Sequence, residues 1–286
     1  MSSHMSTVNL SGHSGHSGHV RHSKHTGHPP PAVHSDLIQS IRLCGNTHVT
    51  NHHDRIRAID HVHATFALLP TIRDIHLFDS TRRTALWWAV DVGSSEITSL
   101  LLQSGATPSD QDSSEWNTIH VACDKGYANI LELLLCPSLH QSPATLPSSN
   151  LVHARTSGPR WTALHLAASN GHVECVRKLL SVGASVFDLT EDGYTPLLLC
   201  CTGGSDGHAS CCQLLLAAGA NADVSDPSDG ETPLHKACRS GMVEVAECLL
   251  EYGASIKLDH AGVTPISHAL ARGFDWDVVV KPRTRR

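Results

Sequence analysis

The chain has 286 residues, of which 40 % are hydrophobic and 4 % aromatic, and its formal net charge is −6 at pH 7. Because aromatic residues are scarce, a core has to be built mainly from Leu, Ala, Val and Cys. No long basic run is present, which argues against nucleic acid as a partner. No apolar run reaches about 18 residues, which argues against a membrane span, and the amino-terminal residues lack the apolar stretch of a signal peptide.

Residues 1–35 are expected to form a disordered tail rich in His, Gly and Ser. Within it, residues 11–28 place a histidine at every third position, and each glycine between them disfavours a helix by about 1 kcal/mol. In an extended chain of three residues per turn these rings would stand about 9 Å apart, whereas two nitrogen ligands of one zinc ion lie within about 4 Å of each other. We therefore expect a solvated tail, with weak metal binding of no fixed geometry as the alternative.

Residues 36–78 are expected to form a degenerate N-terminal capping repeat. The segment SDLIQSIRLCGN predicts a first helix that ends at Gly45, and DRIRAIDHVHATFALLP predicts a long second helix that Pro70 stops. Terminal repeats are usually atypical because one of their faces meets solvent.

From residue 79 to residue 281 the chain repeats itself. The repeats start near Thr84, Asn117, Thr162, Thr195, Thr232 and Thr264. The spacings between these starts are 33, 45, 33, 37 and 32 residues, which is a 33-residue period with local insertions. A Pro- and Ser-rich segment at 136–160 accounts for the longest spacing and predicts a long loop. The last repeat is incomplete, and a basic tail follows at 282–286.

One repeat, TPLHKACRSGMVEVAECLLEYGA, shows the local physics. Thr232 is an N-cap and His235 follows at the position that completes a capping box. Gly241 ends the first helix, and Val245 and Leu249 lie on the apolar stripe of a second helix. One such unit cannot bury its own apolar face, so we expect the units to stack.

These repeats resemble the ankyrin repeat, whose signature T-P-L-H-x-A stands at Thr232 and, with changes, at the other starts. The resemblance implies an all-α fold, an ankyrin-repeat solenoid of helix pairs with short β-hairpin fingers. It also implies a non-enzymatic scaffold or adaptor that binds a protein partner through the concave groove. The hairpin glycine of the family is replaced by Arg82, Glu115 and Arg160 in three units, so those turns lack the residue that favours them.

The sequence shows no catalytic, cofactor-binding or metal-binding constellation in the repeats, and we expect no cofactor. His120, His165 and His235 recur in register with the N-caps, which favours a structural role over catalysis. The ten cysteines include no C-x-x-C pair and several lie in apolar helical stretches. We therefore expect buried free thiols and an intracellular location, in the cytoplasm and also in the nucleus as an alternative.

The candidate partner-binding residues lie on the first helices and on one finger tip. They are Trp87, Asp124, Lys125, Ser169, Asn170, Glu191, Asp192, Lys236, Arg239 and Ser240. Their mixed charges predict a polar protein partner. For Trp87 a binding anchor and a core residue are equally good interpretations, whereas Trp88 is expected to pack against the capping repeat.

The last repeats, GETPLHKACRSGMVEVAECLLEYGASIKLDHAGVTPISHAL, also resemble those of ankyrin repeat and SOCS-box proteins. That resemblance implies a second function, substrate recognition for a cullin-type ubiquitin ligase through the elongin pair. We expect no SOCS box in this chain, because no suitable helical segment follows Lys281. Phe274 and Trp276 lie after the last first helix and are expected to be partly exposed.

Overall fold

The computed structural model describes residues 32–45, 75–136, 151–204 and 207–273, and every regular element assigned in these ranges is a helix. The first helices of the repeats are α3 (Ala85–Asp91), α5 (Thr118–Lys125), α8 (Ala163–Ser169), α10 (Pro196–Cys200), α12 (Pro233–Ser240) and α14 (Pro265–Ala271). The second helices are α4 (Ser95–Gln103), α6 (Ala128–Leu135), α9 (Val173–Ser181), α11 (Gly207–Ala217) and α13 (Val243–Glu251). α1 (Ala32–Gly45) precedes them.

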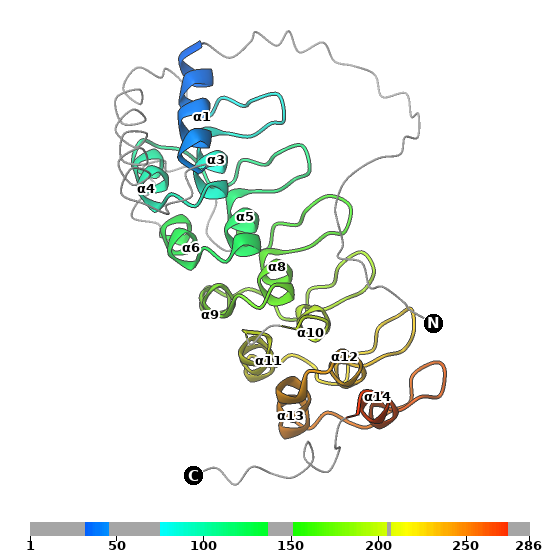
Figure 1. Cartoon of the computed structure of the whole chain (residues 1–286). Coiled ribbons are helices and arrows are strands. Elements are labelled where there is room, and N and C mark those ends of the chain that lie inside the picture. Colours follow the sequence, from blue (N-terminus) through cyan, green and yellow to red (C-terminus); the bar gives the residue numbers. More distant parts are fainter. Residues whose placement is uncertain (1–31, 46–74, 137–150, 205–206, 274–286) are drawn as a thin grey trace, which may run out of the picture.

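The helix pairs form a single stack in which first helices contact first helices and second helices contact second helices (Figure 1). A loop projects from the stack before each first helix, and α1 packs on α3 at the amino-terminal end. This is the solenoid that the 33-residue period predicts. Its core runs through the whole stack, because each unit leaves apolar surface that only the next unit covers.

The first helices begin directly after the repeat starts, since Thr or Asn acts as the N-cap. Asn117, Thr162 and Thr232 each form a capping box with the histidine three residues later. Leu86, Leu131 and Leu164 are among the largest fully buried side chains of the core. Nine cysteines are free thiols in the described part of the chain. Most of them, Cys123 among them, are buried and pack as small apolar residues.

The capping histidines also join neighbouring repeats. His165 accepts a 3.2 Å hydrogen bond at Nδ1 from the backbone N–H of Thr162, and its Nε2 lies 3.1 Å from the carbonyl oxygen of Tyr194. Because a carbonyl can only accept, Nε2 carries the proton and the ring is neutral. Burial lowers the pKa of His165, and likewise that of His120, to about 4. The expected structural role of these residues is matched by a hydrogen bond at each ring nitrogen of His120 and His165.

The projecting loops, called fingers below, comprise residues 79–83, 112–116, 156–161, 190–194, 226–231 and 259–263. Each is closed by a backbone hydrogen bond of 2.8–3.0 Å between its first and last residues. The expected hairpins are therefore tight turns, without an assigned strand in the described residues. Arg82, Glu115 and Arg160 have φ values of 60°, 60° and 56°, so these turns keep the left-handed conformation without glycine.

The structure differs from the sequence-based expectation in two places, at the start of α1 and near the end of the segment 136–160. α1 ends at Gly45, as the sequence predicts, but it begins at Ala32, so the last residues assigned to the disordered tail are helical. Leu151 and Val152, expected in the long loop, form a helical turn and are 5 % and 1 % exposed. The expected second capping helix, most of the loop at 136–160, the histidine run and the segment after Gly273 lie outside the described residues.

Candidate functional site

A cavity of about 450 Å³ opens between the amino-terminal first helices and the fingers. Its lining includes Arg83, Trp87, Asp112, Trp116, Asp124 and Lys125, which come from α3, α5 and the two fingers that precede them. We call this surface the groove cavity. It brings together three residues that the sequence singled out, Trp87, Asp124 and Lys125, with three that it did not.

The two tryptophans of α3 lie in different surroundings. Trp87 is 6 % exposed, and the Arg83 guanidinium lies 3.9 Å from its ring centroid. Trp88 is half-buried, and its Nε1 donates a 2.9 Å hydrogen bond to Asp79. The guanidinium of Arg42 in α1 lies 3.7 Å from the centroid of the Trp88 ring. Trp88 therefore contacts α1, which lies in the segment expected to cap the stack, but Trp87 is the more buried of the two.

Asp112 organises the finger that forms one wall of the groove cavity. Its side chain is 4 % exposed and lies 3.5 Å from Nε of Arg83. Its Oδ1 accepts hydrogen bonds of 2.8 and 3.0 Å from the backbone N–H groups of Ser114 and Trp116. These contacts hold the Trp116 backbone and the Arg83 side chain in place beside the cavity.

Next to the groove cavity, candidate residues from two repeats contact each other directly, although Ser169 and Asn170 are not among its lining residues. Asn170 donates through Nδ2 to the carbonyl oxygen of Asp124 at 3.1 Å and to its Oδ1 at 3.2 Å. The Lys125 ammonium lies 3.7 Å from Asp91, and 45 % of its side chain is exposed. Ser169 is half-buried at the end of α8. Asp124 and Lys125 therefore offer charges of both signs to the groove cavity.

Four other candidate residues lie farther along the stack, two at a finger tip and two at the end of a first helix. Glu191 and Asp192 are exposed at a finger tip, and the Glu191 backbone N–H donates to the carbonyl of Pro159 at 2.9 Å. Ser240 is exposed and Arg239 half-buried at the end of α12. They do not line the groove cavity.

Lys236 departs from its expected place on the surface. Its side chain is 6 % exposed and lies 2.6 Å from Oδ2 of Asp226, whose own side chain is 1 % exposed. Burial raises the pKa of Asp226, but hydrogen bonds from Lys236 and Ser228 outweigh burial and lower it to about 2. The buried Lys236 side chain thus joins α12 to the finger of residues 226–231 instead of facing solvent.

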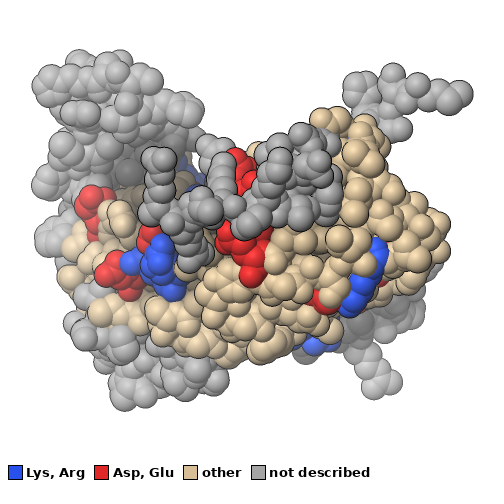
Figure 2. Space-filling view, turned by 90° about the horizontal axis from the view of Figure 1, so that it is seen from below, with Lys and Arg blue, Asp and Glu red and all other residues tan. Residues whose placement is uncertain are grey.

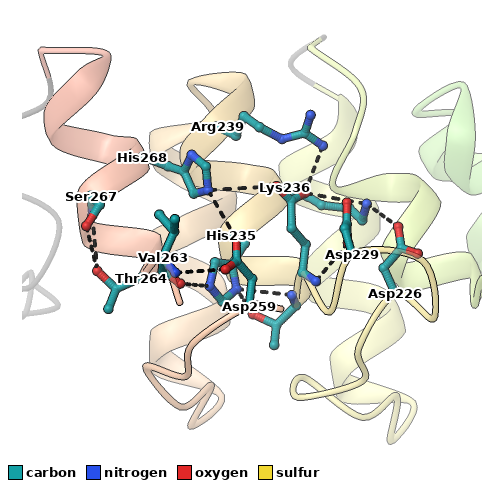
Figure 3. Close-up of polar contacts among 12 residues, drawn as sticks. Asp226, Asp229, His235, Lys236, Arg239, Asp259, Val263, Thr264, Ser267 and His268 are labelled. Carbon is teal, nitrogen blue, oxygen red and sulfur yellow. Dashed lines mark hydrogen bonds and ion pairs between the residues drawn. The ribbon is translucent and has the colours of Figure 1, made fainter. Parts of the chain in front are cut away.

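Lys236 belongs to a group of charged residues that we call the C-terminal polar cluster (Figure 3). Its members are Asp226, Asp229, Glu231, Lys236, Arg239, Asp259 and His268. Arg239 lies 2.8 Å from Oε2 of Glu231, a carboxylate that is 7 % exposed. Among the described residues, the face seen from below is mostly uncharged, with small groups of both signs (Figure 2).

Comparison with known proteins places this architecture in a family. The family model described as Ankyrin repeats (3 copies) matches residues 56–145, 146–226 and 204–279. The chain belongs to the ankyrin repeat family. The ankyrin repeat domain of Bcl-3 superimposes with a TM-score of 0.61 at 26 % identity, covering 83 % of this chain and 92 % of that one. The human ASB11 ankyrin repeat domain has a TM-score of 0.59 at 24 % identity over 83 % of this chain and 90 % of that one, a likeness of fold.

Curated ankyrin relatives match over parts of much longer proteins. Human transient receptor potential cation channel subfamily A member 1 is 27 % identical over 248 residues, which is 84 % of this chain and 21 % of that protein. The ankyrin repeat and KH domain-containing protein mask-1 of Caenorhabditis elegans is 33 % identical over 111 residues, 38 % of this chain and 4 % of that protein. The chain thus spans less than a quarter of either relative. In the described part of this ankyrin stack, no helix is long and apolar enough to cross a membrane.

The ankyrin register explains why Arg83, Asp112 and Trp116 were missed. All three lie in fingers, whereas the residues predicted from the sequence lie on the first helices and on a single finger tip. A signal was present, because an aspartate recurs at the start of four fingers, at positions 79, 112, 226 and 259. Recurrence in register indicates a shared role in these four fingers, and Asp79, like Asp112, accepts hydrogen bonds from backbone N–H groups of its own finger.

Proposed function

We propose that this chain is a non-enzymatic scaffold or adaptor whose groove cavity binds one polar segment of a partner protein. Ankyrin repeat domains generally mediate protein–protein interaction. The observation that carries the proposal is the groove cavity itself, in which Trp87 and Trp116 lie beside charged side chains of both signs. Aromatic residues flanked by polar groups are typical of the energetically dominant part of protein interfaces.

The fingers beside the cavity supply a second line of support. Arg82, Glu115 and Arg160 hold left-handed backbone conformations that cost about 1 kcal/mol or more in a residue other than glycine. Such strain tends to occur where function requires a particular side chain. Glu115 and Arg160 also line a second hollow together with Glu191. Charged side chains are thereby presented on successive finger tips, where a partner lying across the fingers would meet them.

Mixed charge favours a protein over nucleic acid as the partner. The groove cavity contains two cations, Arg83 and Lys125, and three carboxylates, Asp91, Asp112 and Asp124. A phosphate backbone requires a cationic surface, whereas a polar protein segment can pair with both signs. The intracellular location is part of the proposal, and the buried free thiols support it because they suit a reducing compartment.

The test is affinity purification from the native cell with matched charge reversals. Lys125→Glu alters an exposed cation of the groove cavity, and Arg177→Glu alters an exposed cation on the second helix α9. We expect a specific partner to be lost with Lys125→Glu and kept with Arg177→Glu, while both variants melt like the parent. Capture of the same proteins by both variants would remove the groove cavity as the binding site.

The second function, substrate recognition for a cullin-type ubiquitin ligase, stays a prediction of the sequence resemblance. The same purification tests it when the captured proteins are scored for elongin and cullin subunits. Their recovery with the parent and with both variants would indicate a recruitment surface apart from the groove cavity.

A further inference from the structure

Three potential metal ligands converge within the C-terminal polar cluster. Glu231 ends one finger and Asp259 begins the next. His268 of α14 lies near Asp259 in Figure 3 and is also close to Glu231. Nε2 of His268 lies 3.7 Å from Oε1 of Glu231 and 4.0 Å from Oδ2 of Asp259. One ligand atom from each residue lies within 4.8 Å of the other two.

These separations do not suit hydrogen bonds but do suit ligands of one small cation. A hydrogen bond between nitrogen and oxygen requires about 2.7–3.2 Å. Around a tetrahedral zinc ion with bonds of about 2.0–2.2 Å, two ligand atoms lie roughly 3.3–3.6 Å apart. The two separations from His268, 3.7 and 4.0 Å, exceed this range by at most a few tenths of an ångström, and all three ligand atoms lie within 4.8 Å of one another, so the side chains would close on a bound ion.

His268 supplies an independent indication of a missing partner. Its Nε2 is buried and makes no hydrogen bond, although a buried polar atom without a partner costs about 1–3 kcal/mol. The two carboxylates that face it are each 7 % exposed. A cation bound to Nε2 would satisfy the nitrogen lone pair, with the ring proton on Nδ1.

The C-terminal polar cluster carries a net negative charge that one divalent cation would neutralise. Its carboxylates belong to Asp226, Asp229, Glu231 and Asp259, and its fixed cations belong to Lys236 and Arg239, so the net charge with neutral His268 is −2. Arg239 and Lys236 both approach Oε2 of Glu231, at 2.8 and 3.6 Å, which leaves Oε1 facing His268. They would thus orient the carboxylate from the side away from the ion.

We propose that Glu231, Asp259 and His268 form a binding site for one divalent transition-metal cation of the zinc type, with water completing its coordination. An imidazole ligand favours such ions over calcium and magnesium, which prefer oxygen alone. The ion would link the last two fingers to α14 and would stabilise the carboxyl-terminal end of the stack. This site is independent of the groove cavity and of the histidine-rich tail.

The test uses the full chain in which the histidines of residues 11–28 are replaced by asparagine, so that the tail does not compete for metal. Zn²⁺ is titrated against a chromophoric chelator, Co²⁺ is followed by its visible absorption, and thermal melting is recorded with and without Zn²⁺. We expect one bound equivalent of Zn²⁺ and a higher melting temperature in its presence.

Variants then assign the site. His268→Asn and Asp259→Asn should weaken Zn²⁺ binding at least about tenfold, a loss of about 1.4 kcal/mol, and should abolish the Zn²⁺-dependent rise in melting temperature. His260→Asn, on the same finger as Asp259 and exposed, should bind like the parent. If one variant fails to fold by circular dichroism, the other decides. No stoichiometric Zn²⁺ in the parent, or undiminished binding in the folded variants, would overturn the proposal.

Discussion

Nε2 of His120 lies 3.0 Å from the carbonyl oxygen of Ala154, a residue 34 positions later in the chain. The same ring accepts a hydrogen bond from the backbone N–H of Asn117 at the start of its own helix. One neutral imidazole therefore caps a helix and also binds the segment that leads into the finger of the following repeat. Protonation would place a second donor at Nδ1, opposite the Asn117 N–H, and would break this arrangement.

Stability should consequently fall in mild acid. Burial lowers the pKa of His120 from 6.5 to about 4, so the unfolded chain binds a proton that the folded chain excludes in this range. This contribution to stability is present above pH 6.5 and is lost as the pH falls toward 4, by an amount on the order of 3 kcal/mol. Urea unfolding at a series of pH values measures it.

The matched variant for the pH effect is His120→Gln, because glutamine suits the same capping-box position and does not titrate. We expect the free energy of unfolding of His120→Gln to change less than that of the parent between pH 7 and pH 5. An equal change in the two proteins would show that other groups cause the acid sensitivity.

Glycine at the strained finger turns should stabilise the protein. Arg82→Gly, Glu115→Gly and Arg160→Gly each relieve a left-handed residue, and we expect each to raise the free energy of unfolding by about 1 kcal/mol. Gly262→Ala is the reverse control, since Gly262 has φ of 74° and a Cβ there would meet nothing within 4 Å. It should lower stability by a similar amount. Chemical denaturation of the four variants decides the point.

Removal of the buried Lys236 ammonium should be severely destabilising. Lys236→Met leaves the carboxylate of Asp226 buried without its 2.6 Å partner, and we expect a loss of about 3–5 kcal/mol. Combining it with Asp226→Asn removes the uncompensated charge and should recover part of the loss. Arg239→Ala, at a side chain that is 38 % exposed, should cost less. Equal losses for Lys236→Met and Arg239→Ala would contradict this account.

The amino-terminal helix should contribute to the stability of the repeats. Leu37 in α1 is fully buried, and Leu37→Ala should lower the free energy of unfolding by about 2–5 kcal/mol. Gln39→Ala, at an exposed position of the same helix, should have little effect. Thermal and chemical melts of the two variants compare them directly, and similar melting temperatures would indicate that α1 is dispensable for the stack.

Much of the fold followed from local patterns. The period of the repeats, the N-caps at Thr162 and Thr232, and the glycine that ends α12 all depend on interactions between residues close in the chain. Such interactions recur wherever the same residues recur, so the helix pairs and their stacking could be predicted without knowledge of the tertiary structure. The structural role of His165 followed in the same way.

Three features of the candidate sites were decided only by tertiary structure. Whether Lys236 faces solvent depends on the finger that covers it, and Asp226 lies on that finger. The groove cavity forms because Trp87 and Trp116 come from successive repeats whose spacing in space is set by packing. His268 meets Asp259 and Glu231 because α14 stacks on α12. In each case the contacting residues lie in different structural elements. The free energy of such a contact depends on how deeply it is buried, and no single repeat provides that burial.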